Sequence, residues 1–266
     1  MELSFGLEQY RMSKRLSKHP KIGKIISSTL GTLNIGQYAR YRIFKSIIKT
    51  LQLKSINTIL DLGCGQGEYS FMMARSFPHK QILALDIEKS RLESIDKIIC
   101  SDKLKNINTH CGTIGSISDT RKFDFIYSID VFEHILEEEM PFDQVYDKLN
   151  PGGYFFIKMP NKNQTNIFPE FLFKSHSKWL EDEHIGQVFE LQDLEKRLRE
   201  SGFKLIKSFY ADGWLSRLSW ELWYLSKKIR PEFQILFTPF LKILVCIDQL
   251  TQTKTKGNTI QALVKK

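Results

Sequence analysis

The 266-residue sequence lacks the marks of a membrane-spanning or secreted protein. Its most apolar stretch, residues 233–250, is interrupted by Pro239, Lys242 and Asp248, which makes it a poor transmembrane segment. The first residues, MELSFGLEQYRMSKR, contain neither an apolar core nor the small-residue cleavage site of a secretory signal. The sequence therefore predicts a cytoplasmic protein, and a peripheral position at the inner membrane surface stays open.

Cysteine is also scarce. The four cysteines lie far apart, and no CxxC pair or Cys/His cluster with zinc spacing is present. This pattern does not suit a disulfide framework. We expect Cys64, Cys100, Cys111 and Cys246 to be buried, reduced thiols, and we expect no metal site.

Acidic residues are few at both ends of the chain. Residues 1–50 contain ten Lys and Arg against two acidic residues, and residues 213–266 contain nine against three. The middle, residues 51–212, contains twenty against twenty-five, so the net charge of +9 belongs to the flanks. Basic flanks attract nucleic acid, anionic lipid or a small anionic substrate, and the alternative is solubilising surface charge.

The middle of the chain alternates between short apolar runs and helical stretches, with no internal repeat or Pro/Gly-rich linker. Such alternation predicts a parallel sheet whose two faces are covered by helices, which is an α/β fold. The predicted strands are residues 58–62, 81–86, 106–111, 123–129 and 154–159.

Near the end of the chain this alternation stops. Two further strands are predicted at residues 203–210 and 258–264, and we expect them to pair as a hairpin. The segment between them, residues 211–257, is rich in Trp, Leu, Phe and Lys and is expected to be a helical insertion. It would form a lid that roofs the substrate pocket with apolar and aromatic groups, a homodimer contact, or a peripheral membrane contact through residues 213–250.

The first predicted strand runs into the sequence DLGCGQG, residues 61–67. Glycines at alternate positions let the backbone turn sharply and approach a ligand, and the next helix offers free N–H groups at its N-terminus. Asp86 ends the second strand, where a carboxylate can accept hydrogen bonds from ribose hydroxyls. Together these features predict a nucleoside-binding site.

The spacing of this turn is GxGxG, and Glu68 stands where a dinucleotide site would carry its third glycine. The stretch TILDLGCGQGEYS resembles the first motif of class I, Rossmann-like methyltransferases that use S-adenosyl-L-methionine. FDFIYSIDVFEHI and LNPGGYFFIKMPN resemble later motifs of the ubiquinone-biosynthesis-like small-molecule type. The resemblance covers about residues 50–210 and the final strand, and it implies a seven-stranded, mostly parallel sheet with the final strand antiparallel.

This resemblance implies a division of the chain into three parts. Residues 1–45 would form a basic helical cap, residues 46–210 with 258–266 the cofactor-binding core, and residues 211–257 the insertion. In the core, glycine backbone would pass under the methionine and ribose, with one acid at the ammonium and another at the ribose. The family's usual Gly-Asp-Ala after the third strand is altered, which changes the adenine contact. The implied cofactor residues are Asp61, Gly63, Gly65, Gly67, Asp86, Ile87, Gly112, Thr113, Ile114, Ser128 and Ile129.

Methyl transfer needs a general base only when the acceptor is protonated at neutral pH. His134 and His184 are the candidates, each with a purely structural role as its alternative. The sequence IDVFEH differs from the motif of enzymes that methylate nucleic-acid bases, which disfavours a nucleic-acid partner. We therefore expect O- or N-methylation of a small, hydrophobic, lipid-linked or glycan-linked acceptor. The alternatives are an RNA methyltransferase that uses the basic flanks, and a non-catalytic methyltransferase-like binding subunit.

Overall fold

The computed structural model describes residues 5, 21, 25, 28–175, 178, 189–229, 233–250 and 256–266, except the side chains of residues 233 and 235. Within these residues a single sheet of seven strands has the order β3-β2-β1-β4-β5-β7-β6. All neighbouring strands are parallel except β7, which is antiparallel to both β5 and β6. The predicted fold class and the predicted terminal hairpin are confirmed. The strands are β1 Thr58–Leu62, β2 Gln81–Asp86, β3 Ile107–Cys111, β4 Phe123–Ile129, β5 Leu149–Pro160, β6 Lys204–Ala211 and β7 Thr259–Lys265.

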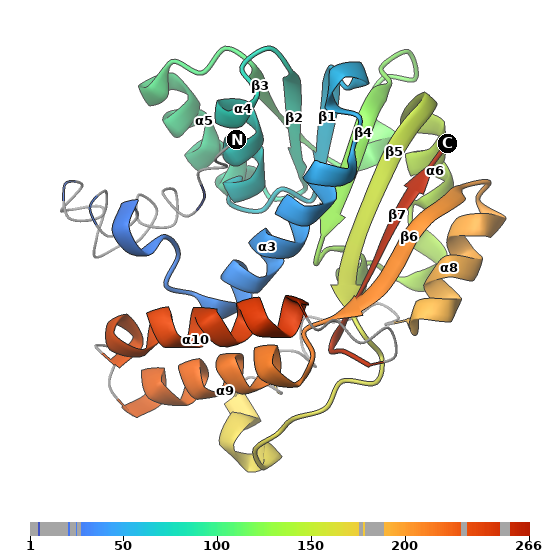
Figure 1. The fold of residues 1–266 in the computed structure, drawn as a ribbon. Coiled ribbons are helices and arrows are strands. Elements are labelled where there is room, and N and C mark those ends of the chain that lie inside the picture. Colours follow the sequence, from blue (N-terminus) through green and yellow to red (C-terminus); the bar gives the residue numbers. More distant parts are fainter. Residues whose placement is uncertain are drawn as a thin grey trace.

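Helices cover both faces of this sheet, because its central strands are apolar on both sides. In β1, Ile59 faces a core that it shares with α3, α4 and α5, whereas the next residue, Leu60, faces a second core beneath α6 and α8. Figure 1 shows α4 and α5 on one side of the sheet and α8 on the other. The helices on these two faces are α3 Ile35–Thr50, α4 Glu68–Ser76, α5 Lys89–Asp102, α6 Phe142–Lys148 and α8 Leu191–Glu200.

Short 3-10 helices lie in the connections between these elements. They are η2 Leu53–Ser55, η3 Ile114–Ser116, η4 Phe132–His134, η5 Glu137–Glu139 and η6 Glu170–Phe173. η4 matters most for the site, because it follows β4 directly at the carboxyl edge of the sheet.

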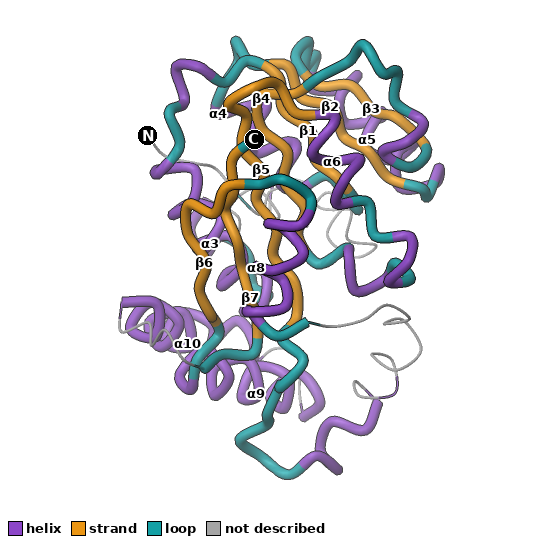
Figure 2. The backbone as a smooth tube through the Cα atoms, turned by 90° about the vertical axis from the view of Figure 1, so that its right-hand side faces the viewer, coloured by secondary structure: helices purple, strands orange, loops and turns teal. Residues whose placement is uncertain are grey.

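The predicted insertion contains two helices, α9 Trp214–Ile229 and α10 Phe233–Leu250. They pack against each other and against α3, around a small apolar cluster of Ile35, Ala39, Trp223, Leu241 and Val245. Figures 1 and 2 show the pair below the end of the sheet at which β6 finishes. Because α3 is continuous from Ile35 to Thr50, the predicted boundary between residues 45 and 46 divides one helix.

The prediction that all four cysteines are buried is wrong for two of them. Cys64 is buried and Cys246 is partly buried, whereas Cys100 and Cys111 are exposed. Cys100 lies on α5 away from the buried residues of that helix, and Cys111 ends the edge strand β3. In the part of the chain that the structure describes, no group of three His, Cys, Asp or Glu could hold a metal ion. No described helix is both long enough and apolar enough to cross a bilayer.

Candidate active site

The glycine turn after β1 is tight at one end and open in the middle. The N–H groups of Gly63 and Cys64 both donate to the carbonyl oxygen of Leu85, at 2.9 and 2.8 Å. Gly63 and Gly65 have φ values of +79° and +54°, which favour glycine. A Cβ atom on Gly63 would lie 2.4 Å from Val131 Cγ2, whereas one on Gly65 would meet nothing within 4 Å. The backbone around Gly65 is therefore a cradle that a ligand can approach closely.

Asp86 lies at this turn, as predicted. Its side chain is 6% exposed, and it accepts hydrogen bonds from the N–H groups of Gly65 at 2.8 Å and Glu88 at 2.9 Å. Each carboxylate oxygen has a second lone pair that can accept another hydrogen bond. Next to it, the Ile87 side chain is 75% exposed at the end of β2. Asp86 therefore offers a hydrogen-bond acceptor for hydroxyl groups, and Ile87 offers an apolar surface beside it.

Asp61 is buried beneath the same turn. It accepts a hydrogen bond from Ser70 Oγ at 2.5 Å. Burial raises the pKa of Asp61 to about 7, although the hydrogen bond from Ser70 opposes the shift. A cationic ligand group near this carboxyl would favour its ionised form. Gly67, at φ +73°, ends the turn as the N-cap of α4.

The other predicted cofactor residues follow β3 and β4. Gly112 has φ +147° and precedes Thr113, the N-cap of η3. The side chain of Ile114 is buried in the core, and Ser128 Oγ donates to a carbonyl oxygen of β1 at 3.0 Å. Ile129 is half-buried. Because the side chains of Ile114 and Ser128 serve the interior, these two residues can present only backbone to a ligand.

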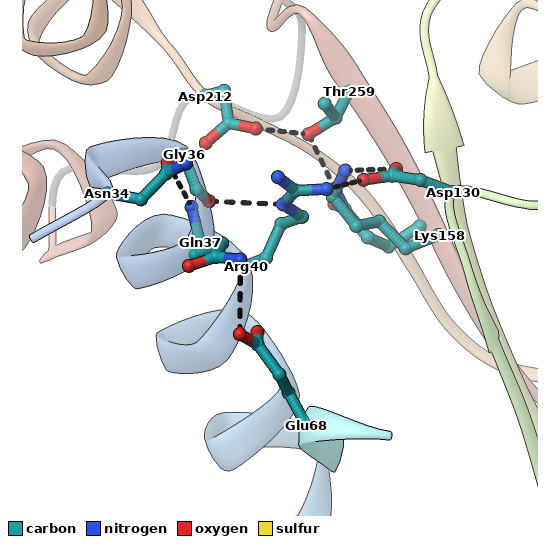
Figure 3. Close-up of polar contacts among 10 residues, drawn as sticks. Asn34, Gly36, Gln37, Arg40, Glu68, Asp130, Lys158, Asp212 and Thr259 are labelled. Carbon is teal, nitrogen blue, oxygen red and sulfur yellow. Dashed lines mark hydrogen bonds and ion pairs between the residues drawn. The ribbon is translucent and has the colours of Figure 1, made fainter. Parts of the chain in front are cut away.

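An ion cluster that was not predicted lies beside the turn and is drawn in Figure 3. Asp130 follows β4 with φ +53° and accepts hydrogen bonds from Arg40 Nη1 and Lys158 Nζ, both at 2.6 Å. Burial raises the pKa of Asp130, but the charges of Lys158 and Arg40 outweigh it and hold this pKa below its usual value. One ionised carboxylate therefore holds two cations from α3 and β5.

Two of these residues did leave a trace in the sequence. Lys158 is the one charge in the apolar run YFFIKM, and a charge in a buried strand needs a partner. Asp130 directly follows the fourth strand, at the edge of the sheet where ligands bind in α/β folds. Arg40 carries no comparable signal, because it lies among other basic residues near the N-terminus.

A cavity of about 480 Å³ opens next to this cluster. Glu133 Oε2 and Asp212 Oδ1 are buried and have no hydrogen-bond partner in the described part of the chain. Burial raises the pKa of Glu133 to about 8 and also raises that of Asp212. The cavity is lined by these two residues and by Ile35, Gly36, Ala39, Arg40, Asp130, His134, Lys158, Pro160, Gln164, Asn166, Phe173, Ser216, Arg217, Trp220, Glu221, Asn258 and Thr259.

The loop after β4 joins the glycine turn to this cavity. Val131 stands against Gly63, whereas Asp130, Glu133 and His134 line the cavity. A ligand in the turn and a ligand in the cavity would therefore contact neighbouring residues of one short loop. His134, predicted as a candidate base, is thus at the cavity, whereas His184 lies outside the described residues.

The predicted roof of apolar and aromatic groups is only partly correct. α9 does cover the cavity, but it contributes the polar side chains Ser216, Arg217 and Glu221 beside the aromatic Trp220. The carboxylate of Glu221 accepts hydrogen bonds from the N–H groups of residues 167 and 168, both at 2.8 Å. α9 packs against both α3 and α10, and its apolar side chains such as Trp223 face those two helices. Polar side chains of α9 are therefore left to face the cavity.

Comparison with known proteins identifies the family. A family model described as a methyltransferase domain matches residues 35–208, and the chain therefore belongs to this methyltransferase domain family. The chain is 30% identical to a malonyl-[acyl-carrier protein] O-methyltransferase of Priestia megaterium, over 36% of this chain and 34% of that protein. It is 26% identical to a ubiquinone biosynthesis O-methyltransferase of Chelativorans sp., over 54% of this chain and 57% of that protein.

These matches span between about a third and just over half of those two curated relatives. Among solved structures, coclaurine N-methyltransferase bound to N-methylheliamine and SAH has the same fold. It covers 90% of this chain, and this chain covers 74% of it, with a TM-score of 0.59 and 16% identity.

Proposed function

We propose that this protein transfers a methyl group from S-adenosylmethionine to an oxygen or nitrogen of a small acceptor bound in the cavity. The observation that carries this proposal is the loop after β4, which touches the glycine turn through Val131 and the cavity through Asp130 and Glu133. A donor held in the turn and an acceptor held in the cavity would meet at this loop. Membership of the methyltransferase domain family supports the same activity.

The open backbone at Gly65 and the buried acid Asp86 fit a nucleoside, and Asp61 would hold the ammonium group, directly or through water. S-adenosylmethionine supplies an activated methyl group: its S–CH₃ bond breaks, a C–O or C–N bond forms, and the acceptor loses a proton. The task of the chain is then to align the acceptor and to limit the access of water, and α9 contributes one wall of the cavity. His134 accepts the proton when the acceptor is a hydroxyl group.

We infer that the acceptor is rich in hydroxyl groups, as a sugar unit is. Among the described residues no group donates to the buried oxygens Glu133 Oε2 and Asp212 Oδ1, and leaving such atoms unpaired is costly. A ligand with several O–H groups can pair with the polar side chains that line the cavity, among them these two carboxyl groups. The rings of Phe173 and Trp220, with centroids 6.0 Å apart and planes tilted by 31°, give the same cavity an aromatic surface on which a sugar ring can lie. This supports the glycan-linked acceptor among those that the sequence left open.

Release of S-adenosylhomocysteine in the presence of simple hexoses, catechols and primary amines tests this acceptor class. We expect hexoses to promote release, and we expect Asp212→Asn to raise KM for the hexose by about tenfold with little change in kcat, because it replaces an acceptor by a donor. Asp193→Asn, which alters an exposed carboxylate on α8, should change neither constant. Preference for catechols or amines would overturn the acceptor class but not methyl transfer itself.

A further inference from the structure

The outer face of α10 carries exposed apolar side chains. Its inner face carries Leu241 and Val245, which are buried against α3 and α9. On the outer face, apolar side chains recur at intervals of three and four residues, which places them along one side of the helix. Their exposed fractions are Leu236 70%, Phe237 45%, Phe240 58%, Ile243 55%, Ile247 42% and Leu250 83%.

The exposed charges at the end of α9 are positive. The two described acids of the hairpin, Glu221 and Asp248, are buried, and their carboxylates accept backbone N–H groups. Lys227 and Lys228 are exposed at the end of α9, beside the exposed Ile229. Since both acids are withdrawn from solvent, the described hairpin presents apolar and basic groups together.

The segment just before α3 contacts α10. Lys242 Nζ donates to the carbonyl oxygen of Leu30, and Thr238 Oγ1 donates to that of Leu33 at 3.4 Å. These contacts tie α10 to residues 1–50, where ten Lys and Arg stand against two acids. The basic residues near the N-terminus therefore adjoin, in sequence, the segment around Leu30 and Leu33 that contacts α10.

We propose that α10 docks on a lipid bilayer that contains anionic lipid. Interfacial helices insert an apolar face to about 5–10 Å while nearby lysines attract anionic headgroups. Trp214, 55% exposed at the start of α9, is of the type that lies at the headgroup level. This location goes beyond the proposed activity and does not depend on it.

A second copy of the chain suits the outer face of α10 less well. Paired helices with this spacing carry charged residues beside the apolar seam, where they form salt bridges between the helices. Here the positions that flank the seam are Phe237, Pro239, Leu244 and Cys246, none of which is charged. The face is therefore broad and uniformly apolar, which suits lipid.

Vesicle flotation of the full-length protein tests this docking. With vesicles of phosphatidylcholine and phosphatidylglycerol we expect the wild type to float, more at low than at high salt, and to float weakly with phosphatidylcholine alone. Phe240→Glu combined with Ile243→Glu should reduce the bound fraction by about tenfold or more, because it places two charges in the apolar face. Binding of S-adenosylhomocysteine by the same variant reports that its core is folded.

Ile206→Glu is the matched control, because Ile206 is also an exposed apolar residue, at 49%, but lies on β6. It should float as the wild type does. Absence of wild-type flotation would overturn the proposal. So would a wild-type dimer in light scattering that Phe240→Glu with Ile243→Glu converts to a monomer, since this would assign the face to a second copy.

Discussion

Gly63→Ala is expected to destroy the cofactor cradle. The new Cβ would lie 2.4 Å from Val131 Cγ2 and 2.7 Å from Cγ1, at a residue whose φ is +79°. Left-handed backbone and overpacking together cost roughly 2–5 kcal/mol, so we expect a comparable fall in the free energy of unfolding. We also expect binding of S-adenosylhomocysteine to fall below detection by calorimetry, because the loop after β4 must move away from the turn.

Two variants isolate the cause of this loss. Gly65→Ala introduces the same backbone strain, at φ +54°, but no atom lies within 4 Å of its Cβ. It should cost only about 1–2 kcal/mol of folding free energy. Adding Val131→Ala to Gly63→Ala removes both clashing methyl groups and should restore part of the stability. Equal losses in Gly63→Ala and Gly65→Ala, with no rescue, would show that the contact with Val131 is unimportant.

Asp130→Asn should be the most damaging change in the ion cluster. Asparagine tolerates the left-handed backbone at this position, so the substitution removes the charge and keeps the local fold. It leaves Arg40 and Lys158 without their shared carboxylate, and Lys158 is only 4% exposed. Breaking a buried ion pair in this way costs roughly 3–5 kcal/mol, which urea unfolding at neutral pH would measure.

The matched control for this change is Asp102→Asn. Asp102 pairs with Arg75 at the same distance, 2.6 Å, but both side chains are more than 20% exposed. We expect a loss of about 1 kcal/mol or less. If Asp130→Asn were no more harmful than Asp102→Asn, the cluster would not need its central negative charge.

The fold and the glycine turn could be predicted because their signals are local. TILDL, QILALD and FDFIYSI are short apolar runs, and each folds into a strand close to the predicted bounds. The turn after Asp61 is specified by glycines within seven residues, and Asp86 ends the next strand. Neighbouring parallel strands bring such segments to one edge of the sheet whatever the rest of the chain does.

The cavity could not be predicted in the same way, because its residues come from distant parts of the chain. Arg40 and Asp130 are 90 residues apart, and their contact depends on how α3 crosses the end of the sheet. The polar side chains that α9 contributes to the cavity could not be predicted for a related reason. The apolar residues of α9 were visible, but α10 and α3 together take up its apolar side and leave polar side chains for the cavity. A helix with two partners cannot be oriented from its own sequence.

Titration of the purified protein with S-adenosylhomocysteine by calorimetry tests the central claim most directly. We predict saturable binding that Asp86→Ala abolishes, because the substitution removes both the carboxylate and its hydrogen bond from Gly65. Asp193→Ala, an exposed carboxylate far along the chain, should bind as the wild type does, and NADH should produce no heat. Binding of NADH, or no binding of S-adenosylhomocysteine by a folded wild type, would contradict the assignment of the glycine turn to S-adenosylmethionine.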